Sequence, residues 1–153
     1  MDPNLNNKPG QTGVIFLSAP TDDEVAQIID LYRQAGWWEP GSDNEGLVKR
    51  LVAGSHCFAA AMLEGRIVGM ARAISDGASD AYIQDVTVKD AHRHSGIATS
   101  LLRAVIERLT SDGIGWVALV AERGSEALYG GLGFFPMKGA VPMRFSGAKE
   151  PER

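Results

Sequence analysis

The sequence predicts an α/β (α+β) fold in which about four helices pack around a mixed central sheet of about six to seven strands. Two observations support this class. The apolar residues of the 153-residue chain switch between runs typical of strands and the spacing of amphipathic helices, in the order β-α-α-β-β-β-α-β-α-β-β. Near the middle of the chain, a strand, a helix and a strand follow one another, which makes the two strands parallel neighbours.

The first two elements are a strand and a helix. Residues 14–20 form a short apolar run that ends at Pro20 and is typical of a strand. The next helix begins after Thr21, because Thr21 and Glu24 have the spacing of a capping box. Its apolar residues lie on one helical face: Val25, Ile28, Ile29 and Tyr32.

A second helix and three strands follow. Ser42 and Glu45 repeat the capping-box spacing before a helix that ends near Gly54. The pattern then changes to that of strands, and Glu64 and Gly65 form the two-residue turn of a hairpin. The three strands are expected over residues 56–63, 66–75 and 81–88.

The last part of the chain is predicted to contain two helices and three strands. A broad apolar face predicts a helix over residues 96–111, which stops at Gly113. The remaining elements are a strand over 116–121, a short helix within 124–133, and two final short strands over 134–137 and 141–145.

Composition indicates one globular domain, and the cysteine content fits a reducing compartment. Hydrophobic residues make up 44% of the chain and charged residues 22%, and the one cysteine, Cys57, excludes an internal disulfide. Since we find neither a signal-peptide pattern nor a membrane-spanning run, we expect a cytoplasmic protein without a membrane partner. The net charge of −4 argues against nucleic acid. We expect a disordered N-terminal tail over residues 1–12, a domain over 13–146 and a C-terminal tail over 147–153.

The turn before the helix at 96–111 is the strongest candidate for a binding site. The N-terminus of a helix carries free N–H groups and a partial positive charge, and Gly96 lets a ligand approach the backbone closely. With Arg93 beside it, such a turn can hold phosphate oxygens. The alternative is a plain connection with a surface arginine. The pattern matches neither a Walker A loop nor a dinucleotide fingerprint.

The segment VTVKDAHRHSGIATSLL resembles the acetyl-CoA motif of the GNAT (Gcn5-related N-acetyltransferase) superfamily, through Arg93, Gly96 and Ala98. A second stretch, LYGGLGFFPM, is similar to the family's later motif, through Tyr129 and Gly133. The resemblance covers about residues 13 to 146. It implies the GNAT fold, with splayed parallel strands four and five, and an acyltransferase that uses acetyl-CoA as cosubstrate.

The resemblance also implies which residues bind acetyl-CoA. The pyrophosphate would lie on the turn formed by Arg93, His94, Ser95, Gly96, Ile97, Ala98 and Thr99. The pantetheine arm would lie along the fourth strand, at Val86, Thr87 and Val88, like a short added strand. The sequence departs from the family pattern at Glu122, often an asparagine, and at Ser125, commonly an alanine. These two departures put acetyl-CoA contacts of that segment in doubt.

Acetyl transfer needs a base, an oxyanion donor and a leaving-group acid. The resemblance assigns the oxyanion to the N–H of Val88 and the acid to Tyr129. Full proton transfer from a tyrosine to a thiolate is uphill by about 2 kcal/mol. A hydrogen bond to the sulfur, or a lowered tyrosine pKa, would close that gap. The alternative is that Tyr129 is an ordinary core residue.

Asp85 is the candidate general base, since it is the ionisable residue of the fourth strand at the place where some family members carry one. A hydrogen-bonded structural aspartate is an equal alternative. The histidines His92 and His94 belong to the phosphate turn, and His56 has no assigned role. No spacing among histidine, cysteine and acidic residues is typical of a metal site, so we expect no metal.

The acceptor is expected to be a small-molecule or peptide amine. Trp37 and Trp38 lie between a helix and a Pro-Gly turn, where they either wall an acceptor pocket or pack on the core. The predicted function is therefore acetyl-CoA-dependent N-acetyl transfer to a primary amine of a small molecule or of a peptide or protein, by direct transfer in a ternary complex. The alternatives are a catalytically silent acyl-CoA sensor and an acyltransferase with another acyl group or acceptor. The sequence does not decide between a monomer and a homodimer.

Overall fold

A five-stranded sheet in the order β1-β2-β3-β4-β5 lies at the centre of the first of two units, Met1–Leu119 and Val120–Arg153. The computed structural model describes residues 10–41, 45–145 and 147. The first three strand pairs are antiparallel, and β4 and β5 are parallel as predicted. The strands are β1 (Gly13–Phe16), β2 (Cys57–Leu63), β3 (Arg66–Ser75), β4 (Asp80–Val88) and β5 (Trp116–Ala118).

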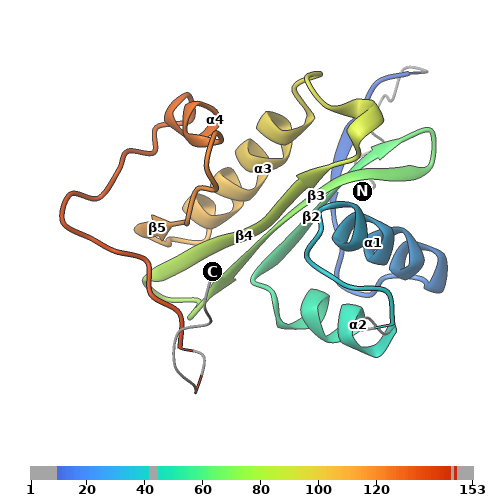
Figure 1. Cartoon of the computed structure of the whole chain (residues 1–153), viewed down its shortest axis with the longest axis horizontal. Coiled ribbons are helices and arrows are strands. Elements are labelled where there is room, and N and C mark those ends of the chain that lie inside the picture. The colour runs from blue at the N-terminus through green and yellow to red at the C-terminus, as the bar shows by residue number, and fades with distance from the viewer. Residues whose placement is uncertain (1–9, 42–44, 146, 148–153) are drawn as a thin grey trace. The chain divides into compact units, whose positions relative to one another are not determined.

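Three longer helices cover the sheet (Figure 1). The helix α1 (Asp22–Gln34) is capped by Thr21 and Glu24 as predicted, because each side chain bonds the backbone of the other. The helix α2 (Glu45–Gly54) ends where the sequence indicated, whereas its predicted cap, Ser42, lies outside the described residues. The helix α3 (Ile97–Ser111) begins directly after Gly96.

The core on one face of the sheet is formed by α1 and α2. Their buried side chains pack with residues of β2 and β3, and the cluster includes Val25, Ile28, Leu31, Tyr32, Val48, Phe58, Ile67 and Met70. Leu101 of α3 packs on Gly69 of β3, where a side chain would not fit. The absence of a side chain at Gly69 therefore lets α3 approach the sheet closely, and α3 carries the predicted phosphate turn at its N-terminus.

Two predicted strands are shorter than expected. The strand β1 ends at Phe16 rather than residue 20, although Leu17 still donates its N–H to the carbonyl of Phe58 at 2.8 Å. Pro20 cannot donate to a strand ladder, so the chain turns before it. The strand β5 ends at Ala118 rather than residue 121, because its pairing with β4 stops there.

The prediction of two final strands is wrong. No strand occurs between residues 120 and 145 or at residue 147, and the one helix there is α4 (Glu126–Gly130). Phe135 and Phe145 are 80% and 95% exposed. Apolar alternation favours a strand only where a neighbouring strand accepts its backbone hydrogen bonds, and these segments pair with none. The sheet therefore has five strands instead of the predicted six to seven.

Candidate active site

Among the described residues, no strand pairs with the second half of β4 on the side away from β3, and we call this side its open edge. Its pairing with β5 covers Asp80–Tyr82 only, opposite Trp116–Ala118. Lys89 donates its backbone N–H to the carbonyl of Val68 on β3 at 2.8 Å. Because successive N–H groups of a strand point to opposite edges, the N–H groups of Val88 and Val86 point away from β3. These are the amides that the sequence analysis assigned to the pantetheine arm.

The predicted phosphate turn joins β4 to α3. A short 3-10 helix, Asp90–His92, leads to Arg93, and both His94 and Gly96 have left-handed backbones with φ of 60° and 81°. The first intrahelical bond of α3 runs from the N–H of Ser100 to the carbonyl of Gly96, at 3.0 Å. The N–H groups of Ile97, Ala98 and Thr99 therefore have no partner inside the helix and can bind an anion.

Arg93 has a structural role that the sequence analysis missed. Its Nε donates to the carbonyl of Val88 at 3.3 Å, and its Nη2 lies 3.0 Å from the carboxylate of Asp90. The side chain, which is half-exposed, thus braces the turn against the end of β4. Ser95 donates its hydroxyl to the carbonyl of His92, which closes the turn further. The turn is pre-organised by its own residues.

Asp85 lies in a partly buried hydrogen-bond network rather than alone on its strand. Its Oδ2 accepts a hydrogen bond from the hydroxyl of Tyr32 at 2.7 Å and forms an ion pair with Nε of Arg72 at 2.5 Å. Arg72 also donates to Gln84 at 3.0 Å and is 9% exposed. Burial raises the pKa of Tyr32, and the charge of Asp85 raises it further, so Tyr32 stays a hydrogen-bond donor. The role of Asp85 as general base remains a prediction.

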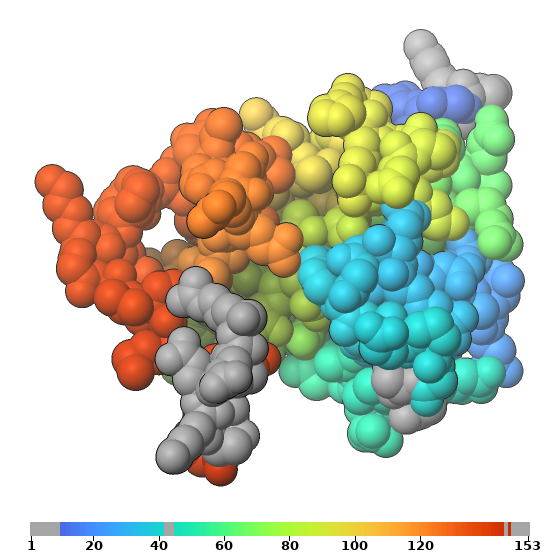
Figure 2. Space-filling model, viewed as in Figure 1, coloured from blue at the N-terminus to red at the C-terminus, as the bar shows by residue number. Residues whose placement is uncertain are grey.

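Trp37 and Trp38 both pack on Tyr32. The Trp38 ring stacks on it with centroids 4.1 Å apart and an interplanar angle of 8°, whereas Trp37 meets it edge-on at 5.9 Å. Trp37 is 37% exposed. The structure thus brings together the predicted acceptor residues and Asp85, through one tyrosine. Figure 2 shows the residues that follow α1 (cyan) and the turn before α3 (yellow) on the same face.

Arg72 and Tyr32 could have been found in the sequence. An arginine in the middle of an apolar strand, VGMARAI, needs a buried partner of opposite charge. Tyr32 was predicted as part of an apolar helix face, which is correct for its ring but not for its hydroxyl. What the sequence did not reveal is which carboxylate they would share.

Tyr129 belongs to the second unit and lies on α4. Its ring meets that of Phe134 edge-on, with centroids 6.1 Å apart. Within residues 120–145 and 147, no group forms a hydrogen bond with the Tyr129 hydroxyl. Burial raises the pKa of Tyr129, and the negative charge of Glu122 adds to that effect. Both effects oppose the lowered tyrosine pKa that full proton transfer would need.

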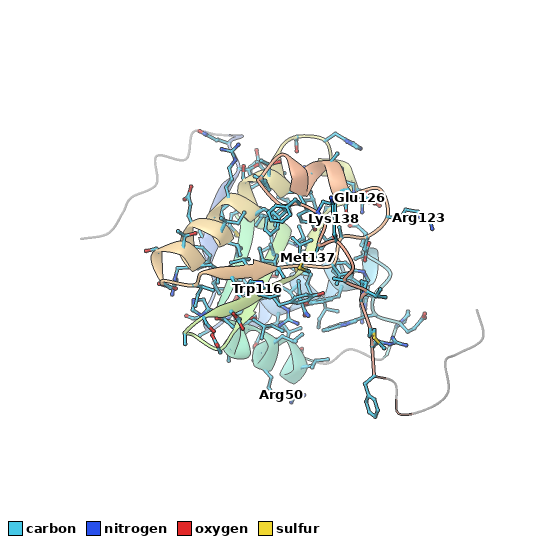
Figure 3. All side chains as sticks on the ribbon, turned by 90° about the vertical axis from the view of Figure 1, so that its left-hand side faces the viewer. Arg50, Trp116, Arg123, Glu126, Met137 and Lys138 are labelled. Atoms are coloured by element: carbon cyan, nitrogen blue, oxygen red, sulfur yellow. The ribbon has the colours of Figure 1, made fainter. Side chains whose placement is uncertain are left out.

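Hydrogen bonds within residues 122–126 stabilise the turn that leads into α4. Glu126, labelled in Figure 3, accepts the N–H of Gly124 at 2.8 Å. Ser125 donates its hydroxyl to the carbonyl of Glu122 at 2.6 Å. The two positions that depart from the GNAT pattern, Glu122 and Ser125, are thus bonded to each other and fix the turn that precedes Tyr129.

His56, which had no predicted role, forms a hydrogen bond with Asp112 at the end of α3. Its Nε2 is 2.8 Å from Oδ2 of Asp112, which also accepts from Nε of Arg108 at 2.7 Å. Among the described residues, no group of three or more histidine, cysteine or acidic side chains could hold a metal ion. No helix of the described chain is both long and apolar enough to cross a membrane.

A family model described as the Acetyltransferase (GNAT) family matches residues 22–134. The soybean (Glycine max) protein named histone acetyltransferase TAP1 is 38% identical over 128 residues, which cover 78% of this chain and 55% of that protein. This chain therefore spans about half the length of that relative.

Two solved structures show the same fold. A probable acetyltransferase of unknown function from meticillin-resistant Staphylococcus aureus has a TM-score of 0.73 at 17% identity, covering 89% of this chain and 99% of that chain. The enzyme AAC(6')-Iy, in complex with the bisubstrate analogue CoA-S-monomethyl-acetylneamine, has a TM-score of 0.68 at 18% identity, covering 88% and 98%. These likenesses confirm the predicted fold class.

Proposed function

This chain belongs to the acetyltransferase (GNAT) family, and we propose on that basis that it is an acetyl-CoA-dependent N-acetyltransferase. In the proposed reaction, an acetyl group moves to a primary amine of a small molecule or of a peptide or protein, by direct transfer in a ternary complex. The observation that carries the proposal is the turn at the start of α3, which presents three unpartnered N–H groups behind a glycine.

Acetyl-CoA fits the residues that are present. Open space surrounds the position where a Cβ of Gly96 would stand, so a phosphate can reach the N–H groups of Ile97, Ala98 and Thr99. The open edge of β4 offers the N–H groups of Val86 and Val88 to an extended pantetheine arm. A structural neighbour was solved with a CoA conjugate, which supports the same cosubstrate here.

Direct transfer is favoured because the chain offers no cysteine nucleophile. Cys57 is the one cysteine of the sequence, and its side chain is buried in β2. Burial raises the pKa of its thiol, so the reactive thiolate is disfavoured. In the proposed mechanism, the amine attacks the thioester carbon itself, a C–N bond forms, and the C–S bond breaks to release the thiolate of CoA.

The charges that develop during this step need three groups. Removing a proton from an alkyl ammonium at neutral pH costs about 4 to 5 kcal/mol, which calls for a base, and Asp85 is the candidate. The N–H of Val88 would stabilise the oxyanion. Tyr129 would donate a hydrogen bond to the departing sulfur. Because its pKa is raised, this hydrogen bond, rather than full proton transfer, is the contribution we assign to it.

The acceptor is proposed to bind beside Trp37 and Trp38, where an exposed aromatic edge can contact an amine-bearing molecule. One matched protein is named a histone acetyltransferase, and one matched structure was solved with an acetylneamine conjugate of CoA, so the proposal stays at the level of a primary amine.

An acceptor screen tests the proposed function. The full chain is incubated with acetyl-CoA and a panel of polyamines, aminoglycosides and lysine peptides, and released thiol is followed with a thiol-reactive dye. We expect amine-dependent release, with acetylated product detected by mass spectrometry. Calorimetric binding of acetyl-CoA without release for any amine would instead identify a silent acyl-CoA-binding protein.

A further inference from the structure

A bulge interrupts the pairing of β3 with β4 just before the open edge. The residue pairs on either side leave Ala71 of β3 opposite two residues of β4, Asp85 and Val86. Such an extra residue is a β-bulge. Asp85 has φ of 55°, a left-handed conformation that is uncommon outside glycine, although aspartate tolerates it better than most residues. Contacts of its side chain can stabilise this conformation further.

Arg72 and Tyr32 hold this residue from two different elements. Both donate to the same atom, Oδ2 of Asp85, from Nε at 2.5 Å and from the hydroxyl at 2.7 Å. The side chains of Arg72 and Asp85 are 10% and 23% exposed, so water competes little with this ion pair. Arg72 also donates to Gln84, the residue before the bulge. The bulge residue Asp85 is thus held from both α1 and β3.

The bulge decides which backbone groups face the open edge. Along a strand, N–H groups alternate between the two edges, so adding or removing one residue exchanges the two sets. With the bulge, Val86 and Val88 present their N–H groups to the open edge. Without it, β4 would slip by one residue, and the N–H of Thr87 would face that edge instead.

We propose that Arg72 and Tyr32 are positioning residues for acetyl transfer, which hold Asp85 in the bulge and thereby keep the N–H groups of Val86 and Val88 on the open edge of β4. This inference rests on the proposed function, because acetyl-CoA is the ligand that those groups would bind. The effect of Arg72 and Tyr32 on the reaction passes through the backbone of β4.

The variant Tyr32→Phe tests the proposal most cleanly. It removes the hydroxyl and keeps the ring that packs with Trp37 and Trp38. In the ligand-free protein, we expect the backbone amide resonances of residues 85 to 88 to shift and their hydrogen exchange to accelerate. With acetyl-CoA, we expect kcat/KM to fall about tenfold, since a hydrogen bond to a charged group is lost.

The matched control is Ser75→Ala. Ser75 donates its hydroxyl to the carbonyl of Asp80 at 2.7 Å, so it links the same two strands at the end away from the bulge. We expect this variant to keep the parent resonances at residues 85 to 88 and the parent kcat/KM. If Tyr32→Phe also keeps both parent values, the positioning role is wrong.

The variant Asp85→Asn separates positioning from general-base catalysis. An asparagine keeps an oxygen that accepts from Arg72 and Tyr32 but cannot take up a proton. Because the proposed function makes Asp85 the base, we expect kcat of this variant to fall about a hundredfold or more, with the parent amide resonances kept at residues 86 to 88. Tyr32→Phe keeps the carboxylate and should instead change the resonances of residues 85 to 88. Parent kcat/KM and parent resonances in Tyr32→Phe, with a large loss in Asp85→Asn, would leave Asp85 as a base alone and overturn the positioning role.

The amide resonances recorded without acetyl-CoA distinguish a failure of the positioning role from a failure of the proposed function. If Tyr32→Phe changes the amide resonances but the parent neither binds acetyl-CoA nor transfers acetyl groups, the proposed function fails and the positioning role in acetyl transfer fails with it. If the parent transfers acetyl groups and the resonances do not respond to Tyr32→Phe, the positioning proposal alone fails.

Discussion

The backbone of Gly69 on β3 lies so close to Thr87 on β4 that a Cβ on Gly69 would stand 3.0 Å from the Thr87 carbonyl oxygen. The same Cβ would meet side-chain carbons of Leu101 and Val88, each at 3.2 Å. The absence of a side chain at Gly69 therefore sets how closely α3 packs on β3 and β4. The candidate acetyl-CoA site is formed by β4 and the turn before α3, so this packing positions the site.

Replacing Gly69 with alanine should destabilise the protein. The added methyl group must displace backbone as well as side chains, and such overpacking costs about 1 to 3 kcal/mol. Chemical denaturation would measure the loss in the free energy of unfolding. Gly115→Ala is the control, because a Cβ there meets nothing within 4 Å. Equal stability of the two variants would show that β4 adapts freely at this contact.

Replacing Gly96 with valine should weaken acetyl-CoA binding by more than about tenfold, since a branched side chain would stand between the phosphate and the helix N-terminus. The control is Gly113→Val at the other end of α3. Both glycines have left-handed backbones, with φ of 81° and 83°, and open space around them. The backbone strain is therefore matched. Isothermal titration calorimetry that gives the same affinity for both variants would contradict the assignment of the turn.

Replacing Tyr129 with phenylalanine should lower kcat by roughly ten- to a thousandfold and leave folding and acetyl-CoA affinity nearly unchanged. The ring contact with Phe134 is kept, and only the hydroxyl is lost. The loss should be smaller with an acyl donor whose thiol is more acidic, because that thiolate departs without help. A packing defect would instead harm both donors alike and lower the melting temperature.

Replacing Trp37 with alanine should raise the KM for the amine acceptor several-fold and leave acetyl-CoA affinity unchanged. Trp37 is 37% exposed at the edge of the Tyr32 cluster, so its removal should disturb the core little. Trp116, which is 52% exposed on β5, provides the control as Trp116→Ala. Steady-state kinetics with unchanged acceptor KM in Trp37→Ala would place the acceptor elsewhere.

The cluster at the end of α3 should make stability depend on pH in the acid range. The hydrogen bond from Arg108, and then that from His56, holds the pKa of Asp112 below its ordinary value. A carboxylate with a lowered folded-state pKa stabilises the protein above its unfolded pKa, near about 4, and this contribution is lost as the pH falls below that. Melting temperatures between about pH 3 and pH 6 should therefore fall less steeply for Asp112→Asn than for the parent.

Much of the fold followed from local patterns. The capping box at Thr21, the Glu64–Gly65 turn and the parallel β4–β5 pair were predicted, because each depends on neighbouring residues or on chain connectivity. The two final strands were wrongly predicted, since apolar alternation alone does not supply a partner strand. In the second unit, side chains such as Phe145 are exposed rather than paired.

The candidate site was predictable where it depends on backbone and not where it depends on long-range pairing. The turn at Gly96 can be predicted from the sequence, because a glycine directly precedes the apolar pattern of a helix. The bond between Tyr32 and Asp85 joins residues 53 positions apart, and no local pattern predicts such a contact. The same holds for the bulge, which requires knowing the register of β3 on β4.

Hydrogen exchange of the full chain, with and without acetyl-CoA, tests the central claim most directly. If acetyl-CoA binds as proposed, the amides of residues 86 and 88 and of residues 94 to 99 should become protected, while those of α2 should not change. Protection confined to other segments, or no protection at saturating acetyl-CoA, would contradict the assignment of the β4 edge and the α3 turn as the acetyl-CoA site.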